Sequence, residues 1–370
     1  MVFTDLLKLM KHKKASDLFI TAGVPPSIKV DGRIQALTKQ ALTPEQSRDF
    51  AYSIMTEDQR KIFDESNECN FAIHPQEIGR FRVNVFVQQT FTGMVLRTIE
   101  TMIPKIEELQ LPKVISEVAM TRRGLVIFVG GTGSGKSTSL AAMIGYRNEH
   151  SYGHIITIED PIEFVHEHNN CIVTQREVGV DTDSFEVALV NAMRQAPDVI
   201  LIGEIRTRET MDKAVVFAET GHLCLATLHA NNSYQALDRI INFFPEERRD
   251  QLLMDLSLNL KAIVSQRLIK KQGGKGRVPG VEVLINTPLI ADLVLKGKVN
   301  EMRAVIAKST EAGMQTFDQS MFALYEDDLI SYEDALRNAD SVNDLRLRIK
   351  LESKRSKHGE LGESMRNVTF

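Results

Sequence analysis

The chain has 370 residues, more than one ordinary domain of about 100 to 200 residues requires, so we expect two domains. Its composition is 43% hydrophobic and 25% charged, which excludes disorder as the main state because disordered chains contain fewer apolar residues. The 45 basic and 49 acidic side chains leave a net charge of −4, which disfavours a protein that coats nucleic acid.

The sequence also indicates the compartment. It contains no run of about 18 apolar residues that could span a bilayer, and Asp5 and Lys8 interrupt the first apolar stretch, unlike a secretory signal. We therefore expect the protein to stay in the cytoplasm. Cys69, Cys171 and Cys224 are odd in number and far apart, so we expect neither disulfides nor zinc and interpret them as small buried hydrophobes.

The first hundred residues are predicted to form a small α+β domain. Apolar-rich runs on both sides of Asp31-Gly32 predict a tight β-hairpin. Residues 44–64 are predicted to be helical, because Thr43-Pro44-Glu45 is typical of a capped helix start. Residues 81–89 and 94–99 are predicted strands, and the prolines within residues 101–115 suit a semi-rigid linker.

From Arg123 onward, short apolar runs alternate with segments of helix length. These runs lack the period-two polarity of half-exposed strands, which indicates strands buried on both faces of a largely parallel sheet. They comprise residues 125–129, 154–158, 198–202 and 223–228.

The last third of the chain is predicted to be mainly helical. Residues 245–271 are expected to form one long amphipathic helix, with Leu253, Leu256, Leu260 and Ile263 on its core stripe. Beyond Asp344 the sequence becomes basic, and we expect its end to be frayed.

A phosphate-binding motif follows the first buried run. Residues 130–137 match GxxxxGK[ST] between a predicted strand and a predicted helix. Glycines let backbone N–H groups approach phosphates, and the helix N-terminus adds the positive end of its dipole. Lys136 is expected at the β- and γ-phosphates of ATP and the Ser137 hydroxyl on Mg²⁺. The predicted nucleotide-binding residues are Gly130, Gly131, Thr132, Gly133, Ser134, Gly135, Lys136, Ser137 and Thr138.

Hydrolysis also requires groups that hold Mg²⁺ and orient an attacking water. The run at 198–202 leads to Glu204, at the edge of a parallel sheet where ligands bind, so Glu204 is the candidate for polarising water. Glu159, Asp160 and Glu163 follow another run and are expected to supply the acidic contribution to the metal. For Asp160 and Glu163, the alternative is that they cap the next helix.

Histidines flank the last buried run. His222 and His229 lie at its two ends, where one could sense the γ-phosphate or position Glu204, and the alternative is a structural role. His166 and His168 have no third ligand nearby, so we interpret them as surface residues and expect no zinc site.

Together, the P-loop, TIEDPIEF, LIGEIR and TGHLCLATLHA resemble the secretion ATPase superfamily, and within it the PilT/PilU type IV pilus retraction motors. The resemblance runs from ASDLFITAG to GMQTFDQSM, nearly the whole chain. It implies an α/β fold, with a PAS-like α+β domain before a RecA-like P-loop ATPase domain. The expected divisions are a PAS-like domain at 1–100, a linker at 101–115, the ATPase domain with its C-terminal helices at 116–352 and a flexible basic tail at 353–370.

The resemblance also implies site residues and assembly. Six subunits would form a ring that hydrolyses ATP at subunit interfaces. Arg82 and Arg97 best match the arginines that the first domain supplies to those interfaces, and the alternative is that they face solvent. Ser137, Glu163 and Glu204 would hold Mg²⁺, partly through water. In this sequence the family's Walker A lysine matches Lys136, its Asp-box glutamate Glu163 and its Walker B glutamate Glu204. Its His-box histidines match His222 and His229.

Departures from the family pattern narrow the expectation. Three scattered cysteines cannot build the four-cysteine zinc module of the extension motors, which argues for retraction. Residues 289–296 replace the AIRNLIRE motif of PilT proteins, and with the basic tail this resembles the PilU branch.

We therefore expect a hexameric, Mg²⁺-dependent ATPase of the PilU type. It would be cytoplasmic and peripheral at the inner-membrane pilus machine, with a PilT-like motor and the pilus platform protein as partners in retraction and twitching motility. The alternative is an ATP-binding adaptor that regulates a partner motor with little hydrolysis of its own. A nucleic-acid translocase is a third possibility, against which the near-neutral charge argues.

Overall fold

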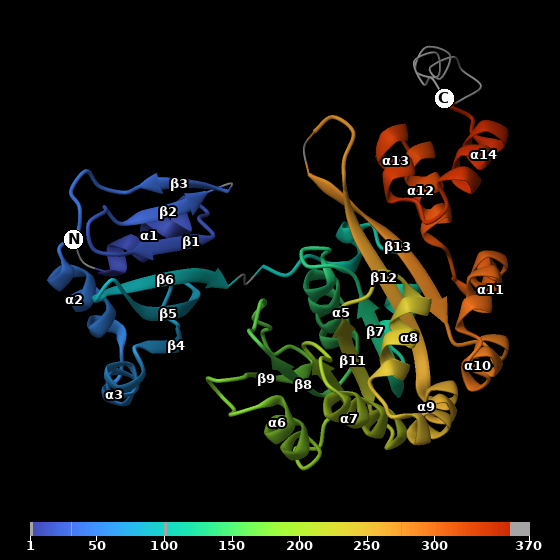
Figure 1. The fold of residues 1–370 in the computed structure, drawn as a ribbon, viewed down its shortest axis with the longest axis horizontal. Helices are drawn as coiled ribbons and strands as arrows, with labels where there is room; N and C mark the ends of the chain where they lie inside the picture. The colour runs from blue at the N-terminus through green and yellow to red at the C-terminus, as the bar shows by residue number, and fades with distance from the viewer. Residues whose placement is uncertain (1–2, 31, 100–101, 275, 356–370) are drawn as a thin grey trace. The chain divides into compact units, whose positions relative to one another are not determined.

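The computed structural model describes residues 3–30, 32–99, 102–274 and 276–355 (Figure 1). They form two compact units. The first contains the described residues up to Met102 together with Asp160–His166 and Arg176–Ser184, and the second contains the others. The division that we predicted at 1–100, 101–115, 116–352 and 353–370 stays a prediction, and residues 100–101 and most of the predicted tail lie outside the described residues.

The first unit is built on a six-stranded sheet with the order β3-β2-β1-β6-β5-β4. β2 and β3 pair antiparallel with Val30 opposite Arg33, which confirms the predicted hairpin, although Asp31 itself lies outside the described residues. Buried side chains of α1, including Leu6, Leu7 and Met10, share one core with the sheet. The strands are β1 (Asp17–Ile20), β2 (Ser27–Val30), β3 (Arg33–Ala36), β4 (Glu68–Ile73), β5 (Arg80–Gln88) and β6 (Phe91–Ile99), and the helices are α1 (Phe3–His12), α2 (Pro44–Ile54) and α3 (Glu57–Ser66).

The helical prediction over 44–64 is confirmed, although the chain forms two helices there, α2 and α3. Met55 between them is extended, with φ −89° and ψ 142°. Thr56 then starts a new helix: its side chain accepts a hydrogen bond from the Gln59 backbone N–H, and the Gln59 side chain accepts one from the Thr56 N–H. This capping box satisfies two N–H groups that a continuous helix would have bonded internally.

The second unit contains a seven-stranded sheet with the order β13-β12-β7-β11-β10-β8-β9. β12, β7, β11, β10 and β8 run parallel, and β13 pairs antiparallel with β12. The four buried runs are confirmed as strands. The sheet consists of β7 (Gly124–Val129), β8 (Gly153–Glu159), β9 (Cys171–Glu177), β10 (Val199–Ile202), β11 (Leu223–Leu228), β12 (Leu260–Lys270) and β13 (Arg277–Ile285).

The long helix predicted over 245–271 is wrong. α9 covers Glu246–Asn259, and β12 begins at the next residue, Leu260. Ile263 and Val264 lie opposite Ile127 and Phe128 of β7, and both are fully buried. Branched side chains buried between two neighbouring strands favour the extended conformation over a helix.

Helices complete the second unit. Figure 1 shows α12, α13 and α14 gathered beside the β12–β13 hairpin, where Phe317, Met321 and Ile349 share a core with β12 and β13 residues. Within the described residues no helix combines the length and the apolar character needed to cross a bilayer. The helices are α4 (Val114–Ala119), α5 (Lys136–His150), α6 (Phe185–Ala192), α7 (Arg208–Glu219), α8 (Ser233–Asn242), α9, α10 (Pro288–Leu295), α11 (Met302–Lys308), α12 (Phe317–Glu326), α13 (Tyr332–Asn338) and α14 (Val342–Glu352).

The expectations for the cysteines and for His168 are confirmed, but the one for His166 is wrong. Cys69, Cys171 and Cys224 are free and buried, as predicted. His166 is not the surface residue that we predicted: it is buried, and this burial lowers its pKa to about 4. His168 is exposed, as expected.

Candidate active site

The P-loop connects β7 to α5 in the second unit. Gly135 has a left-handed φ of +90° and directly precedes α5, whose first turn has no side-chain cap. The first backbone N–H groups of α5 therefore remain available to an anion. The Lys136 ammonium donates to the carbonyl oxygens of Gly130 and Gly131, at 2.8 and 2.9 Å, so it lies across the loop.

Two P-loop glycines lie against strand β12. A Cβ at Gly130 would come within 2.5 Å of the Gln266 carbonyl oxygen, and one at Gly135 within 2.6 Å of Gln266 Nε2. Both glycines also have φ in the region that favours glycine, at +154° and +90°. The Gln266 side chain accepts a hydrogen bond from Ser139 Oγ of α5 at 2.8 Å. β12 thus supports the P-loop, a role that sequence reasoning missed because it predicted a helix there.

Glu204 lies just past the carboxyl end of β10. Its Oε2 accepts a hydrogen bond from Arg206 Nε at 2.8 Å and lies 2.7 Å from Arg206 Nη2. Its Oε1 lies 3.1 Å from His229 Nε2. The Glu204 side chain is 18% exposed, so this carboxylate is partly desolvated yet reachable. Arg206 was not a predicted site residue, although its position two residues after Glu204 was visible in the sequence.

The two predicted histidines lie at opposite ends of β11. His229 contacts Glu204 at the carboxyl end of the strand. His222 Nδ1 lies 3.0 Å from Thr220 Oγ1 and 3.2 Å from the Phe217 carbonyl oxygen at the amino end. The structure therefore brings His229, and not His222, to Glu204, and the catalytic role of His222 stays a prediction.

The P-loop and the segment after β11 line an open pocket of about 330 Å³. Arg239 Nη1 donates to the His229 carbonyl oxygen at 3.0 Å, and Asn231 Nδ2 donates to Gln235 Oε1 at 3.0 Å. Gln235 and Arg239 are four residues apart on α8, a spacing that places them on one helix face and that could have identified them. The lining residues are Gly130, Gly131, His229, Ala230, Asn231, Gln235 and Arg239.

Arg82, Arg97, Asp160 and Glu163 belong to the first unit, whereas Glu159 is the last residue of β8 in the second unit. Arg82 lies opposite Arg97 in the β5–β6 pair, and Arg97 Nε donates to Asp17 Oδ1 at 2.9 Å. Asp160 and Glu163 are both exposed. These first-unit residues belong to a different compact unit from the P-loop, and their roles in the site stay predictions.

The available oxygen donors fit Mg²⁺. Ser137 lies in the first turn of α5, and Glu204 offers a partly exposed carboxylate. Across the part of the chain that the structure describes, no group of three or more His, Cys, Asp or Glu residues could hold a metal alone. Mg²⁺ usually binds through one or two protein oxygens and the phosphates of its substrate, which matches this donor set.

Comparison with known proteins agrees with this geometry. A family model described as "Type II/IV secretion system protein" matches residues 2–339. The type IV pilus ATPase PilU of Pseudomonas aeruginosa is 65% identical over 353 residues, which are 95% of this chain and 92% of that protein. The retraction ATPase PilT of the same organism is 44% identical, covering 92% of this chain and 98% of PilT.

Solved structures give the same result. A crystal structure of the pilus retraction motor PilT with bound ADP superposes with a TM-score of 0.86 at 40% identity, covering 92% of this chain and 98% of that one. The DotB ATPase of Legionella pneumophila has a TM-score of 0.78 at 28% identity, covering 90% and 94% of the two chains. These likenesses confirm the predicted fold class, an N-terminal α+β domain followed by a P-loop ATPase domain.

Proposed function

Because the chain belongs to the PilT/PilU ATPases of the type II/IV secretion family, we propose that it is a PilU-type motor that hydrolyses ATP to assist type IV pilus retraction. Its substrate would be ATP with Mg²⁺. It would work with a PilT-like motor and the platform protein, in the cytoplasm at the inner-membrane pilus machine, in support of twitching motility. The PAS-like and RecA-like division given above is part of this proposal.

The main support for the proposal is that the P-loop, Glu204 and His229 lie at the same edge of one sheet. The P-loop follows β7, Glu204 follows β10 and His229 follows β11, and these strands run parallel in the order β7-β11-β10. The carboxyl ends of parallel strands are where α/β folds bind ligands. Glu204 and His229 lie 3.1 Å apart there, and His229 shares an open pocket with Gly130 and Gly131.

The residues can be given distinct roles in hydrolysis. The P-loop N–H groups and Lys136 bind the triphosphate, and Lys136 offsets charge on the β- and γ-phosphates. Glu204 orients the attacking water toward the γ-phosphorus. His229 holds the Glu204 carboxylate from one side, which fixes the direction in which that carboxylate can accept a proton from water.

Ser137, Glu204 and Glu163 would hold Mg²⁺, partly through water. When bound, this ion neutralises charge that develops on the phosphate oxygens. We further propose a homohexamer in which Arg82 and Arg97 act at a neighbouring subunit's site, because an arginine supplied across an interface stabilises the same developing charge.

Steady-state phosphate release by the purified full chain tests the enzymatic part of this proposal. We expect Mg²⁺-dependent release that rises with ATP and is lost in the Lys136→Ala variant. Release no greater than that of Lys136→Ala, with nucleotide still bound by the parent chain, would instead establish the ATP-binding adaptor. Lack of stimulation by DNA at low salt would exclude the translocase.

A retraction assay in cells tests the pilus role. The PilT-like motor and this chain are each removed singly, and the retraction of individual pili is measured. We expect loss of the PilT-like motor to stop retraction and loss of this chain to reduce its force or frequency. Unchanged retraction without this chain would contradict the accessory role while leaving its ATPase activity intact.

A further inference from the structure

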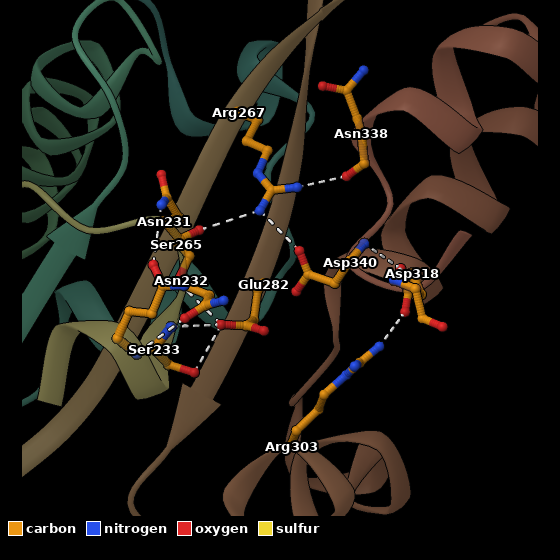
Figure 2. Close-up of polar contacts among 12 residues, drawn as sticks. Asn231, Asn232, Ser233, Ser265, Arg267, Glu282, Arg303, Asp318, Asn338 and Asp340 are labelled. Atoms are coloured by element: carbon orange, nitrogen blue, oxygen red, sulfur yellow. Dashed lines mark hydrogen bonds and ion pairs between the residues drawn. The ribbon is translucent and has the colours of Figure 1, made fainter. Parts of the chain in front are cut away.

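We propose that Glu282 and Arg267 are positioning residues for ATP hydrolysis, which fix the segment from His229 to Ser233 and connect it to the C-terminal helices. We call residues 229–233 the His229 segment. The inference rests on the proposed function of His229 beside Glu204. Figure 2 shows the residues involved, which come from the His229 segment, β12, β13, α11 and the part of the chain that follows α11.

Glu282 fixes the end of the segment. This β13 residue is only 2% exposed, and its Oε1 accepts hydrogen bonds from the Ser233 backbone N–H at 2.8 Å and Ser233 Oγ at 2.7 Å. Ser265 Oγ of β12 donates to the same oxygen at 3.2 Å. Burying a carboxylate costs free energy unless it is hydrogen-bonded, so this site holds Ser233, the first residue of α8, at a defined place.

Arg267 ties the middle of the segment to the C-terminal helices. Its Nη2 donates to the Asn231 carbonyl oxygen at 3.4 Å and to Asp340 Oδ1 at 2.8 Å, and its Nη1 donates to the Asn338 carbonyl oxygen at 2.6 Å (Figure 2). The guanidinium also lies 4.0 Å from the ring centre of Phe317. The flat guanidinium fork of arginine thus contacts three elements at once, which lysine could not reproduce.

Asp318 fixes the backbone at Asp340, the residue whose side chain pairs with Arg267. Its Oδ1 accepts hydrogen bonds from the backbone N–H groups of Asp340, at 2.7 Å, and Ser341, at 3.2 Å, while its Oδ2 lies 2.6 Å from Arg303 Nη2. The position of Asp340 beside Arg267 is therefore set by α11 and α12. A chain of polar contacts runs from these helices to the His229 segment.

The side chains of β12 alternate between two faces of the sheet, and this connects the polar contacts described above to the P-loop. Successive strand residues point to opposite faces of a sheet. Gln266 bonds Ser139 of the P-loop helix, whereas its neighbours Ser265 and Arg267 contact Glu282, the His229 segment and the C-terminal helices. A shift of β12 would therefore change both sides of the candidate active site together.

The start of the segment is fixed by α8 itself. Arg239 donates to the His229 carbonyl oxygen at 3.0 Å, so the place of α8 determines where His229 lies. Asn232 also caps this end of α8 by accepting a hydrogen bond from the Gln235 backbone N–H. We expect loss of the Glu282 hydrogen bonds to loosen the end of the helix that Asn232 alone would then hold and, through Arg239, to displace His229 from Glu204. A displacement of about 1 Å in a catalytic group can lower the rate on the order of 100-fold.

Two substitutions in the full chain test the proposal. We expect Glu282→Leu and Arg267→Gln each to lower kcat for ATP by about 10- to 100-fold, with the Kd for ADP unchanged, because neither residue contacts the P-loop. Glu282→Gln keeps the oxygen that accepts from Ser233 and should retain kcat within about fivefold. Phosphate release gives kcat, nucleotide titration gives Kd, and thermal melting confirms folding.

Arg348→Gln is the matched control. Arg348 also pairs with a carboxylate, Glu352, and lies 4.4 Å from a ring centre, that of Phe322, but both partners belong to the C-terminal helices. We expect its kcat to equal that of the parent. If Glu282→Leu does not fold, Ser233→Ala, which removes one hydroxyl, replaces it with the same expected direction.

The outcomes separate this inference from the proposed function. A parent chain without ATPase activity would overturn the function itself. An active parent with unchanged kcat in Glu282→Leu and Arg267→Gln would overturn only the positioning role. Equal losses of kcat and ADP affinity would also overturn it, because they would indicate general destabilisation of the fold.

Discussion

Two glutamates in the second unit have opposite surroundings. Glu204 is partly exposed at the sheet edge and has two basic partners, Arg206 and His229. Glu282 is buried between β12 and α8. Its hydrogen-bond donors are neutral: the N–H and O–H groups of Ser233 and the O–H group of Ser265. Both are carboxylates near the same segment, yet only Glu204 is partly exposed to solvent.

The difference shows how the surroundings of a carboxylate distinguish a catalytic role from a positioning role. Burial raises the pKa of Glu282, and the hydrogen bonds from Ser233 and Ser265 offset only part of that cost. A group in that place can anchor its neighbours but is not exposed to a substrate at the sheet edge. Glu204 combines partial desolvation with access, which a residue that polarises water requires. Each of the following substitutions tests one side of this comparison.

The largest effect is expected at Glu204. Glu204→Gln keeps the shape of the side chain but removes the charge that orients water, so we expect kcat to fall about 10²- to 10⁴-fold. ADP affinity should be unchanged. Phosphate release is measured beside the control Glu209→Gln, an exposed glutamate in the first turn of α7. Hydrolysis by Glu204→Gln at the parental rate would remove Glu204 from the mechanism.

A smaller effect is expected at His229. His229→Ala removes the imidazole that lies 3.1 Å from Glu204 Oε1, so the carboxylate can turn away from its place. Because a misplacement of about 1 Å in a catalytic group can cost on the order of 100-fold, we expect kcat to fall roughly 10- to 100-fold, less than in Glu204→Gln. His222→Ala is the comparison, because His222 lies at the other end of β11. Equal losses in the two variants would show that proximity to Glu204 is not what matters.

Arg206 should matter less still. Its side chain is 60% exposed, and exposed ion pairs contribute about 0.2 to 1 kcal/mol because water screens them. We expect Arg206→Gln to change kcat by at most about fivefold. Steady-state phosphate release at two salt concentrations checks this, and a loss as large as that of Glu204→Gln would make Arg206 part of the catalytic machinery.

The smallest effect concerns stability at Glu282. The pKa of Glu282 is raised in the folded chain, so the folded state keeps its proton at pH values where the unfolded state has lost it. Stability then falls as pH rises from the unfolded pKa through the folded one. Glu282→Gln lacks this titration, so its melting temperature relative to the parent should rise from pH 4 to pH 8. A constant difference across that range would contradict the assignment.

Local patterns in the sequence predicted much of this fold. Continuous apolar runs identified β7, β8, β10 and β11, because strands buried on both faces leave no polar positions. The same reasoning did not predict β12. Leu256, Leu260 and Ile263 continue the helical spacing of α9 into the strand, and a short buried run cannot be distinguished from a helix by periodicity alone.

The candidate site was predictable where its chemistry lies in short motifs. Lys136, Glu204 and His229 each follow a recognisable strand. Contacts between distant residues were not predictable: Ser233 and Glu282 are 49 residues apart, and Arg267 and Asp340 are 73 apart. No local pattern encodes such pairs, because they depend on which strands and helices become neighbours when the chain folds.

The position of the Lys136 ammonium affects which ions the P-loop can bind. Its ammonium occupies the carbonyl oxygens of Gly130 and Gly131, two acceptors that could otherwise attract a cation. The loop is thereby biased toward presenting N–H donors, so its selectivity for anions comes from hiding acceptors as well as from adding positive charge. A neutral residue at this position would both remove a cation and expose two oxygens that repel phosphate.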